Sequence, residues 1–170
     1  MKSYLIVDGY NIINSWTSLK KIAIENMEEA RDRLIGILAD YCAYKGIEVI
    51  LVFDAHFVKG SRQKEKIIHN IKVVFTKEYE TADSYIEKTV HDLSRLNFVQ
   101  VATSDWEEQI TILSNGGVRI SARELEEEVK CSQKKMKQKF VSREVKAYDL
   151  SHRIEPHILK QLEQWRKKKD

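Results

Sequence analysis

The stretch Ser3–Asp8, which reads SYLIVD, decides the fold: it is a short apolar run that ends in an acid and is followed by Gly9. The run has no helical period, and a short, continuously apolar segment is typical of a strand that is buried on both faces. The same order of an apolar run and a polar end recurs further along the chain. It is found at Ile47 to Phe53, Ile71 to Phe75 and Phe98 to Ala102, and in a shorter form at Val118 to Ile120.

Between these runs the apolar residues are spaced as in helices. Asn26 and Glu29 have the spacing of a capping box, which marks the start of a helix. The helical period returns over residues 81–93, and a further capping-box pair, Ser121 and Glu124, stands near the start of the last third. Strands that alternate with helices need crossover connections, so we expect a three-layer, Rossmann-like α/β fold. Its sheet is mostly parallel, with helices on both faces.

The length of 170 residues favours a single domain. We place this domain at residues 1–150 and expect residues 151–170 to form a C-terminal helical extension. The extension is expected to begin near Pro156, whose fixed φ suits a first helical turn, with residues 143–155 as the connection.

The composition excludes several classes of protein. Hydrophobic residues make up 42% of the chain, which rules out disorder throughout, and six glycines with one proline are too few for a many-turned β-sandwich. No apolar run approaches the roughly 18 residues of a membrane span, and we expect a soluble cytoplasmic protein that does not bind membranes. Cys42 and Cys131 lie far apart, which supports neither a disulfide framework nor a zinc site.

Acids stand at the ends of the expected strands. Asp8, Asp54 and Asp105 each follow an apolar run, and Asp83 lies in the first turn of the helix over 81–93. Ligands bind outside the carboxyl ends of parallel strands, so three of these acids would converge if the first and fourth strands are neighbours. Oxygen-only ligands select Mg²⁺ or Mn²⁺, and such ions serve phosphoryl chemistry by activating water.

Each acid taken alone also has a structural explanation. Asp83 and Asp105 occupy positions where a helix dipole favours a carboxylate, and Asp8 with Gly9 could simply form a turn. The chain contains neither GxxxxGK[ST] nor GxGxxG after its first strand, which excludes a P-loop and leaves a dinucleotide site unsupported. A phosphotransferase that forms an aspartyl-phosphate would often have a second acid two residues after the first, where this chain has Tyr10. A phospho-receiver domain stays open, although Asp83 and Asp105 would then be surplus acids.

Four motifs carry a resemblance to a known family. They are Asp8-Gly9-Tyr10-Asn11, Val52-Phe53-Asp54-Ala55-His56, the stretch from Phe75-Thr76-Lys77 to Glu80-Thr81-Ala82-Asp83, and Ala102-Thr103-Ser104-Asp105. With them the sequence resembles the NYN branch of the PIN-like nucleases, and the whole chain resembles its YacP-like bacterial members. The resemblance implies a PIN-like sheet, a metal-dependent endoribonuclease that hydrolyses RNA phosphodiesters, and an association with ribosomes and translated mRNA. A non-catalytic RNA- or ribosome-binding module on the same fold is the alternative.

The resemblance also assigns roles to residues. Asp8, Asp83 and Asp105 match the family's metal-binding acids, while Asn11 and Ser104 match the polar residues that support them. PIN-like nucleases often have a fourth acid on an intervening helix. Asp54 is the first candidate for that role and Glu80 the second.

Basic residues crowd the last third of the chain. Residues 130–146 contain seven Lys or Arg and one Glu, and a second basic stretch surrounds Arg62 and Lys64. We expect these segments to contact RNA phosphates, although a solvated helix face would have the same composition. The candidate RNA contacts are Lys134, Lys135, Lys137, Lys139, Arg143, Arg62 and Lys64. Tyr10, Trp16 and Trp106 are candidates for stacking on an unpaired base.

Overall fold

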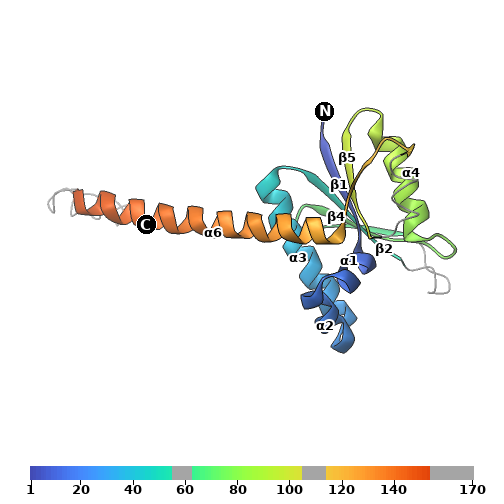
Figure 1. The fold of residues 1–170 in the computed structure, drawn as a ribbon, viewed down its shortest axis with the longest axis horizontal. Helices are drawn as coiled ribbons and strands as arrows, with labels where there is room; N and C mark the ends of the chain where they lie inside the picture. The colour runs from blue at the N-terminus through green and yellow to red at the C-terminus, as the bar shows by residue number, and fades with distance from the viewer. Residues whose placement is uncertain (55–62, 105–113, 154–170) are drawn as a thin grey trace, which may run out of the picture. The chain divides into compact units, whose positions relative to one another are not determined.

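The computed structural model describes residues 1–54, 63–104 and 114–153. Its strands form one six-stranded sheet in the order β3-β4-β2-β1-β5-β6, and helices cover both faces (Figure 1). The strands are β1 (Ser3–Asp8), β2 (Glu48–Phe53), β3 (Lys64–Ile68), β4 (Ile71–Phe75), β5 (Phe98–Ala102) and β6 (Val118–Ile120). The helices are α1 (Gly9–Ser15), α2 (Thr17–Glu25), α3 (Met27–Lys45), α4 (Ala82–Ser94) and α6 (Ala122–Arg153). The α/β class and the mostly parallel sheet are confirmed.

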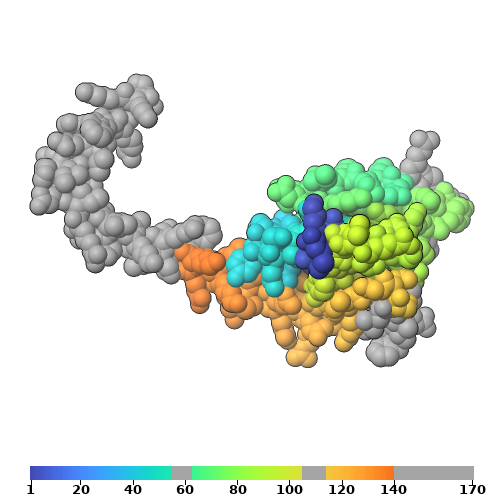
Figure 2. All heavy atoms as spheres, turned by 90° about the horizontal axis from the view of Figure 1, so that it is seen from above, coloured from blue at the N-terminus to red at the C-terminus, as the bar shows by residue number. Residues whose placement is uncertain are grey.

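Strand β1 lies at the centre of the sheet, parallel to β2 on one side and to β5 on the other. Val7 is in register with Leu51 of β2 and with Ala102 of β5, so the three strands end at the same level. Figure 2 shows the blue start of the chain between the cyan and yellow-green segments that lead into its two neighbours. The first and fourth predicted strands are therefore adjacent, as the convergence of the acids requires.

The alternation of side chains along β1 divides the core between the two faces of the sheet. Leu5 and Val7 belong to a cluster with buried residues of α1, α2, α3 and the first turns of α6. Ile6 belongs to a second cluster with α4. Because successive side chains of a strand point to opposite faces, β1 contributes to both clusters.

Helix α3 has the predicted cap at its start and a glycine cap at its end. The Asn26 side chain accepts hydrogen bonds from the backbone N–H groups of Glu28 and Glu29, at 3.0 and 3.2 Å. At the other end Gly46 has a φ of 68°, which a residue without Cβ adopts without strain. Helix α3 returns the chain to the start of β2.

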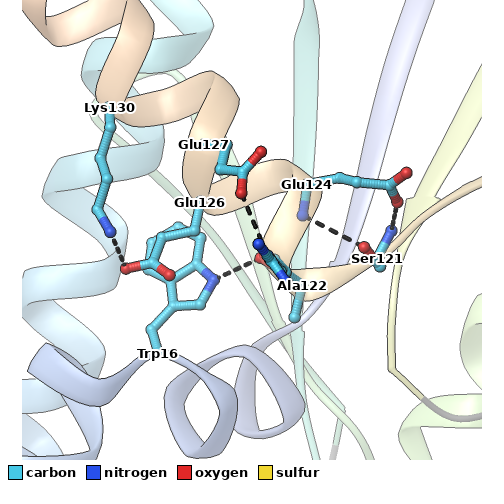
Figure 3. A network of polar contacts seen from close by, with 8 residues as sticks. Trp16, Ser121, Ala122, Glu124, Glu126, Glu127 and Lys130 are labelled. Atoms are coloured by element: carbon cyan, nitrogen blue, oxygen red, sulfur yellow. Dashed lines mark hydrogen bonds and ion pairs between the residues drawn. The ribbon is translucent and has the colours of Figure 1, made fainter.

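The predicted capping box opens α6 (Figure 3). The Glu124 backbone N–H donates to Ser121 Oγ at 3.2 Å, and the Ser121 N–H donates to Glu124 Oε2 at 2.8 Å. The buried indole of Trp16 donates to the Ala122 carbonyl at 2.8 Å, which ties the first turn of α6 to the end of α1.

We predicted a connection over residues 143–155, and this is wrong for residues 143–153, which are helical. Helix α6 runs without interruption from Ala122 to Arg153, and this stretch contains neither Gly nor Pro to end it. The chain divides into two compact units, residues 1–132 and residues 133–170. The separate terminal helix over 151–170 lies almost entirely outside the described residues and stays a prediction.

Three elements were not expected from the sequence. Helix α1 starts immediately after β1, with Asp8 as its cap, and α2 follows at Thr17 without a side-chain cap. Strand β3 pairs antiparallel with β4 at the edge of the sheet, and four of its five residues are exposed. Its charged residues belong to the basic stretch around Arg62 and Lys64, and charges on an exposed edge strand discourage pairing with other chains.

Cys42 and Cys131 are both free thiols, as expected. Within the described part of the chain, no helix is long and apolar enough to cross a membrane.

Candidate functional site

Asp8 lies at the carboxyl end of the central strand and caps the helix that follows. Its Oδ1 accepts a hydrogen bond from the Asn11 backbone N–H at 3.1 Å, which is the standard interaction of an N-cap aspartate. The strand thus passes into α1 without a loop. This direct connection fixes the carboxylate at the edge of the sheet where parallel α/β folds bind ligands.

Asn11 joins Asp8 to the end of the neighbouring strand. Its side-chain Oδ1 accepts a hydrogen bond from the backbone N–H of Ser104 at 3.0 Å. The hydroxyls of Ser104 and Ser15 are 3.5 Å apart. Three of the predicted site residues, Asp8, Asn11 and Ser104, are therefore linked across β1, α1 and the end of β5.

The pKa of the half-buried Asp8 is raised from 3.8 to about 6. Its partial burial is the largest cause, since removing a carboxylate from water penalises its charged form. The backbone hydrogen bond from Asn11 opposes this shift, while the charges of Asp83 and Asp54 add to it. Asp8 is in register with Val52 of β2, two residues before Asp54, so these two acids lie at the same edge of the sheet.

Asp83 and Asp54 approach this edge from different elements. Asp83 lies exposed in the first turn of α4, whose N-cap Thr81 accepts from the Ser84 N–H at 3.2 Å. Asp54 directly follows β2, and its Oδ1 accepts a hydrogen bond from Thr76 Oγ1 at 3.4 Å. Asp8 and Asp54 thus stand at the ends of neighbouring strands, and Asp83 stands at the start of α4.

Aromatic rings support the edge from the face that α3 covers. The Phe53 ring stacks on Phe75, with centroids 5.4 Å apart, and meets the Tyr10 ring edge-on at 5.2 Å. A Cβ on Gly9 would come within 2.3 Å of the Phe53 ring, so only glycine fits there. The guanidinium of Arg31 lies over Phe75 and donates to the Tyr10 hydroxyl at 3.2 Å.

The predicted stacking residues have other roles where the structure describes them. Trp16 is buried and belongs to the core, which contradicts a role in base stacking. Tyr10 is half-buried and packs against Phe53. Trp106 lies outside the described residues.

The donor atoms at the edge suit a hard cation such as Mg²⁺ or Mn²⁺. The three coupled carboxylates offer only oxygen ligands, and Mg²⁺ typically takes one or two carboxylates with several waters. Glu80, which precedes the N-cap of α4, has a buried Oε2 with no hydrogen-bond partner within the described residues. Over those residues no group of three His, Cys, Asp or Glu side chains is arranged to hold a metal ion, and the third predicted ligand, Asp105, falls outside them.

The predicted RNA contacts lie apart from these acids in the sequence. Lys134, Lys135, Lys137 and Lys139 are exposed on α6 in the second unit, and Lys64 is exposed on β3. Arg62 and the side chain of Arg143 lie outside the described residues.

The mostly parallel six-stranded sheet with helices on both faces is an α/β fold of the PIN-like class. The chain belongs to the YacP-like NYN family, whose domain model matches residues 5–167. NYN domains are generally nucleases, and this membership supports a nuclease-like, RNA-related function.

The chain is similar over nearly its whole length to a protein of Bacillus subtilis. It is 42% identical over 166 residues to the uncharacterized protein YacP of that organism, with 96% of each chain covered. The crystal structure of Rae1 (YacP) from Bacillus subtilis superposes with a TM-score of 0.71 at 41% identity, covering 96% of this chain and 94% of that one. The crystal structure of a point mutant of Rae1 gives a TM-score of 0.70 at 43% identity over 79% of both chains.

The raised pKa of Asp8 predicts how stability changes with pH in the absence of divalent cations. The folded protein favours protonated Asp8, so this group's contribution is fully present below pH 3.8 and is lost as the pH rises through about 6. By pH 7 the loss should reach roughly 3 kcal/mol of unfolding free energy. Asp8→Asn keeps an N-cap residue but removes the charge. Urea denaturation in EDTA should therefore show the variant gaining stability over the wild type between pH 4 and pH 7.

A constant difference in unfolding free energy between the two proteins over this pH range would contradict a pKa of Asp8 that burial has raised. The wild-type minus variant difference is the quantity to follow, because it cancels the titration of groups that do not interact with Asp8.

Proposed function

We propose that this chain is a divalent-metal-dependent endoribonuclease that hydrolyses RNA phosphodiester bonds at the carboxyl edge of its sheet. The observation that carries the proposal is the coupling of Asp8, half-buried with a pKa of about 6, to Asp83 and Asp54 in a chain of the YacP-like NYN family. A site that gathers like charges at a cost to stability favours a bound cation. The resemblance to YacP-like members further suggests cytoplasmic mRNA, including mRNA on the ribosome, as the substrate.

Asp8 and Asp83 would hold the ion, with Asp105, Asp54 or Glu80 completing the set. A bound Mg²⁺ or Mn²⁺ supplies charge neutralisation and activation of water at neutral pH. Asn11 fixes the Asp8 carboxylate through its backbone N–H and connects it to Ser104, so that the first acid keeps one orientation. Attack of water on phosphorus with loss of the 3′ oxygen leaves a 5′ phosphate and a 3′ hydroxyl.

The acids of the edge can be tested separately from the other charges of α4. Replacing Asp83 by Asn should lower the Mn²⁺-dependent cleavage rate by roughly a hundredfold or more, since several kcal/mol of charge stabilisation is lost. Asp92→Asn is the matched control, because Asp92 is exposed near the other end of the same helix. Cleavage of a structured RNA and of RNA on translating ribosomes is measured with Mn²⁺ and with EDTA.

Products with a 5′ phosphate, found with Mn²⁺ and absent with EDTA, fit the proposal. Equal cleavage by the Asp83→Asn and Asp92→Asn proteins, or cyclic phosphate ends that persist in EDTA, would contradict it. RNA binding by wild-type protein without cleavage under any of these conditions would instead favour the non-catalytic RNA-binding module.

We further propose that the exposed lysines of α6 contact the RNA backbone, together with Arg143, Arg62 and Lys64. Neutralising Lys134, Lys135, Lys137 and Lys139 to Gln should weaken RNA binding and flatten its salt dependence, by roughly 0.7 in the log-log slope for each phosphate that a lysine no longer neutralises. A double variant of Lys20 and Lys21, exposed on α2, serves as the control. Salt slopes that are the same in both variants would show that this face of α6 is only solvated.

A further inference from the structure

Arg31 is a half-buried cation held in a fixed position near the start of α3. Its guanidinium donates to the Tyr10 hydroxyl at 3.2 Å and lies 5.8 Å from the centre of the Phe75 ring. The neighbours Ala30 and Leu34 are fully buried, so the backbone of this turn is anchored in the core. The planar group is thus restrained by two different contacts before any ligand arrives.

These contacts leave most of the hydrogen-bonding capacity of Arg31 unused. A guanidinium has five N–H donors, and within the described residues only the Tyr10 hydroxyl accepts from it. No carboxylate there forms an ion pair with Arg31. Because Arg31 is only half-buried and pairs with no carboxylate of the described residues, its remaining N–H donors are accessible to an anion that reaches this edge.

The position of Arg31 is set by residues that adjoin the acids. Tyr10 comes two residues after Asp8, and Phe75 directly precedes Thr76, which donates to Asp54. Tyr10 and Phe75 pack against the core cluster that contains α3. Asp83 belongs to α4, which covers the opposite face. Asp83 therefore approaches the edge from the face that α4 covers, and the Arg31 guanidinium lies on the face that α3 covers.

We propose that Arg31 is a phosphate-binding residue that holds the RNA backbone at this edge, on the face of the sheet opposite Asp83. The inference rests on the proposed nuclease function and adds a substrate contact to it. A guanidinium fork matches two phosphate oxygens at once and pairs with them by charge-assisted hydrogen bonds. An edge that presents several carboxylates repels a polyanion, and a fixed cation across the edge offsets that repulsion where the strand must lie.

The test compares two arginines of one helix. Arg33 is exposed two residues further along α3, so Arg31→Met and Arg33→Met remove the same charge from nearly the same place. Binding of a short, labelled single-stranded RNA is measured in EDTA over a series of salt concentrations. Arg31→Met should bind about tenfold more weakly, with a slope reduced by about 0.7, while Arg33→Met stays close to the wild type.

A second variant separates binding from packing. Arg31→Lys keeps the charge but not the planar fork, so it should restore the salt slope of the wild type while recovering only part of the affinity. Thermal unfolding of each protein is recorded alongside. If Arg31→Lys binds as poorly as Arg31→Met with the same reduced slope, or if Arg31→Met binds like Arg33→Met, the phosphate contact is overturned.

Cleavage by the wild-type protein with Mn²⁺ distinguishes a failure of the Arg31 phosphate contact from a failure of the nuclease function. Active wild type with unchanged binding by Arg31→Met overturns the phosphate contact and leaves the nuclease function standing. Weakened binding by Arg31→Met, together with a wild-type protein that never cleaves, supports the phosphate contact and overturns the nuclease function.

Discussion

The partial burial of a carboxylate at the end of the central strand is the constraint on which the rest of the site depends. Asp8 is held by its capping role at α1 and sits close enough to Asp83 and Asp54 to feel their charge. A fold that only needed a helix cap there could use Ser, Thr or Asn at no electrostatic cost. The stability lost by keeping Asp8 ionised makes sense if a cation neutralises the edge during function.

The packing beneath the edge explains why the acids stay in place. Gly9 lets the Phe53 ring cover the start of α1, and Phe75 and Tyr10 hold that ring from two other directions. Trp16 then connects the end of α1 to the first turn of α6. The carboxyl ends of the central strands are thus supported by rigid apolar contacts, which is the arrangement a preorganised site needs.

The sequence predicted those parts of the fold whose signals are local. Apolar runs and side-chain caps such as Asn26 and Ser121 located strands and helices, and the rule for parallel sheets brought Asp8 and Asp83 to one edge. Helices α1 and α2 were not predicted because no loop or capping box separates them from their neighbours. Strand β3 was not predicted because an exposed edge strand has no apolar face. Arg31 looked like any surface charge of a helix, since its significance lies in contacts with Tyr10 and Phe75 that are distant in sequence.

Titration with Mn²⁺ followed by thermal unfolding tests the central claim most directly, because a ligand that binds only the folded state raises its unfolding temperature. If the coupled acids hold a cation, the unfolding temperature of the wild-type protein should rise with Mn²⁺ concentration, and that of the Asp83→Asn protein should rise much less. An unfolding temperature that responds equally to Mn²⁺ in both proteins, or in neither, would contradict the claim that this edge is a metal site.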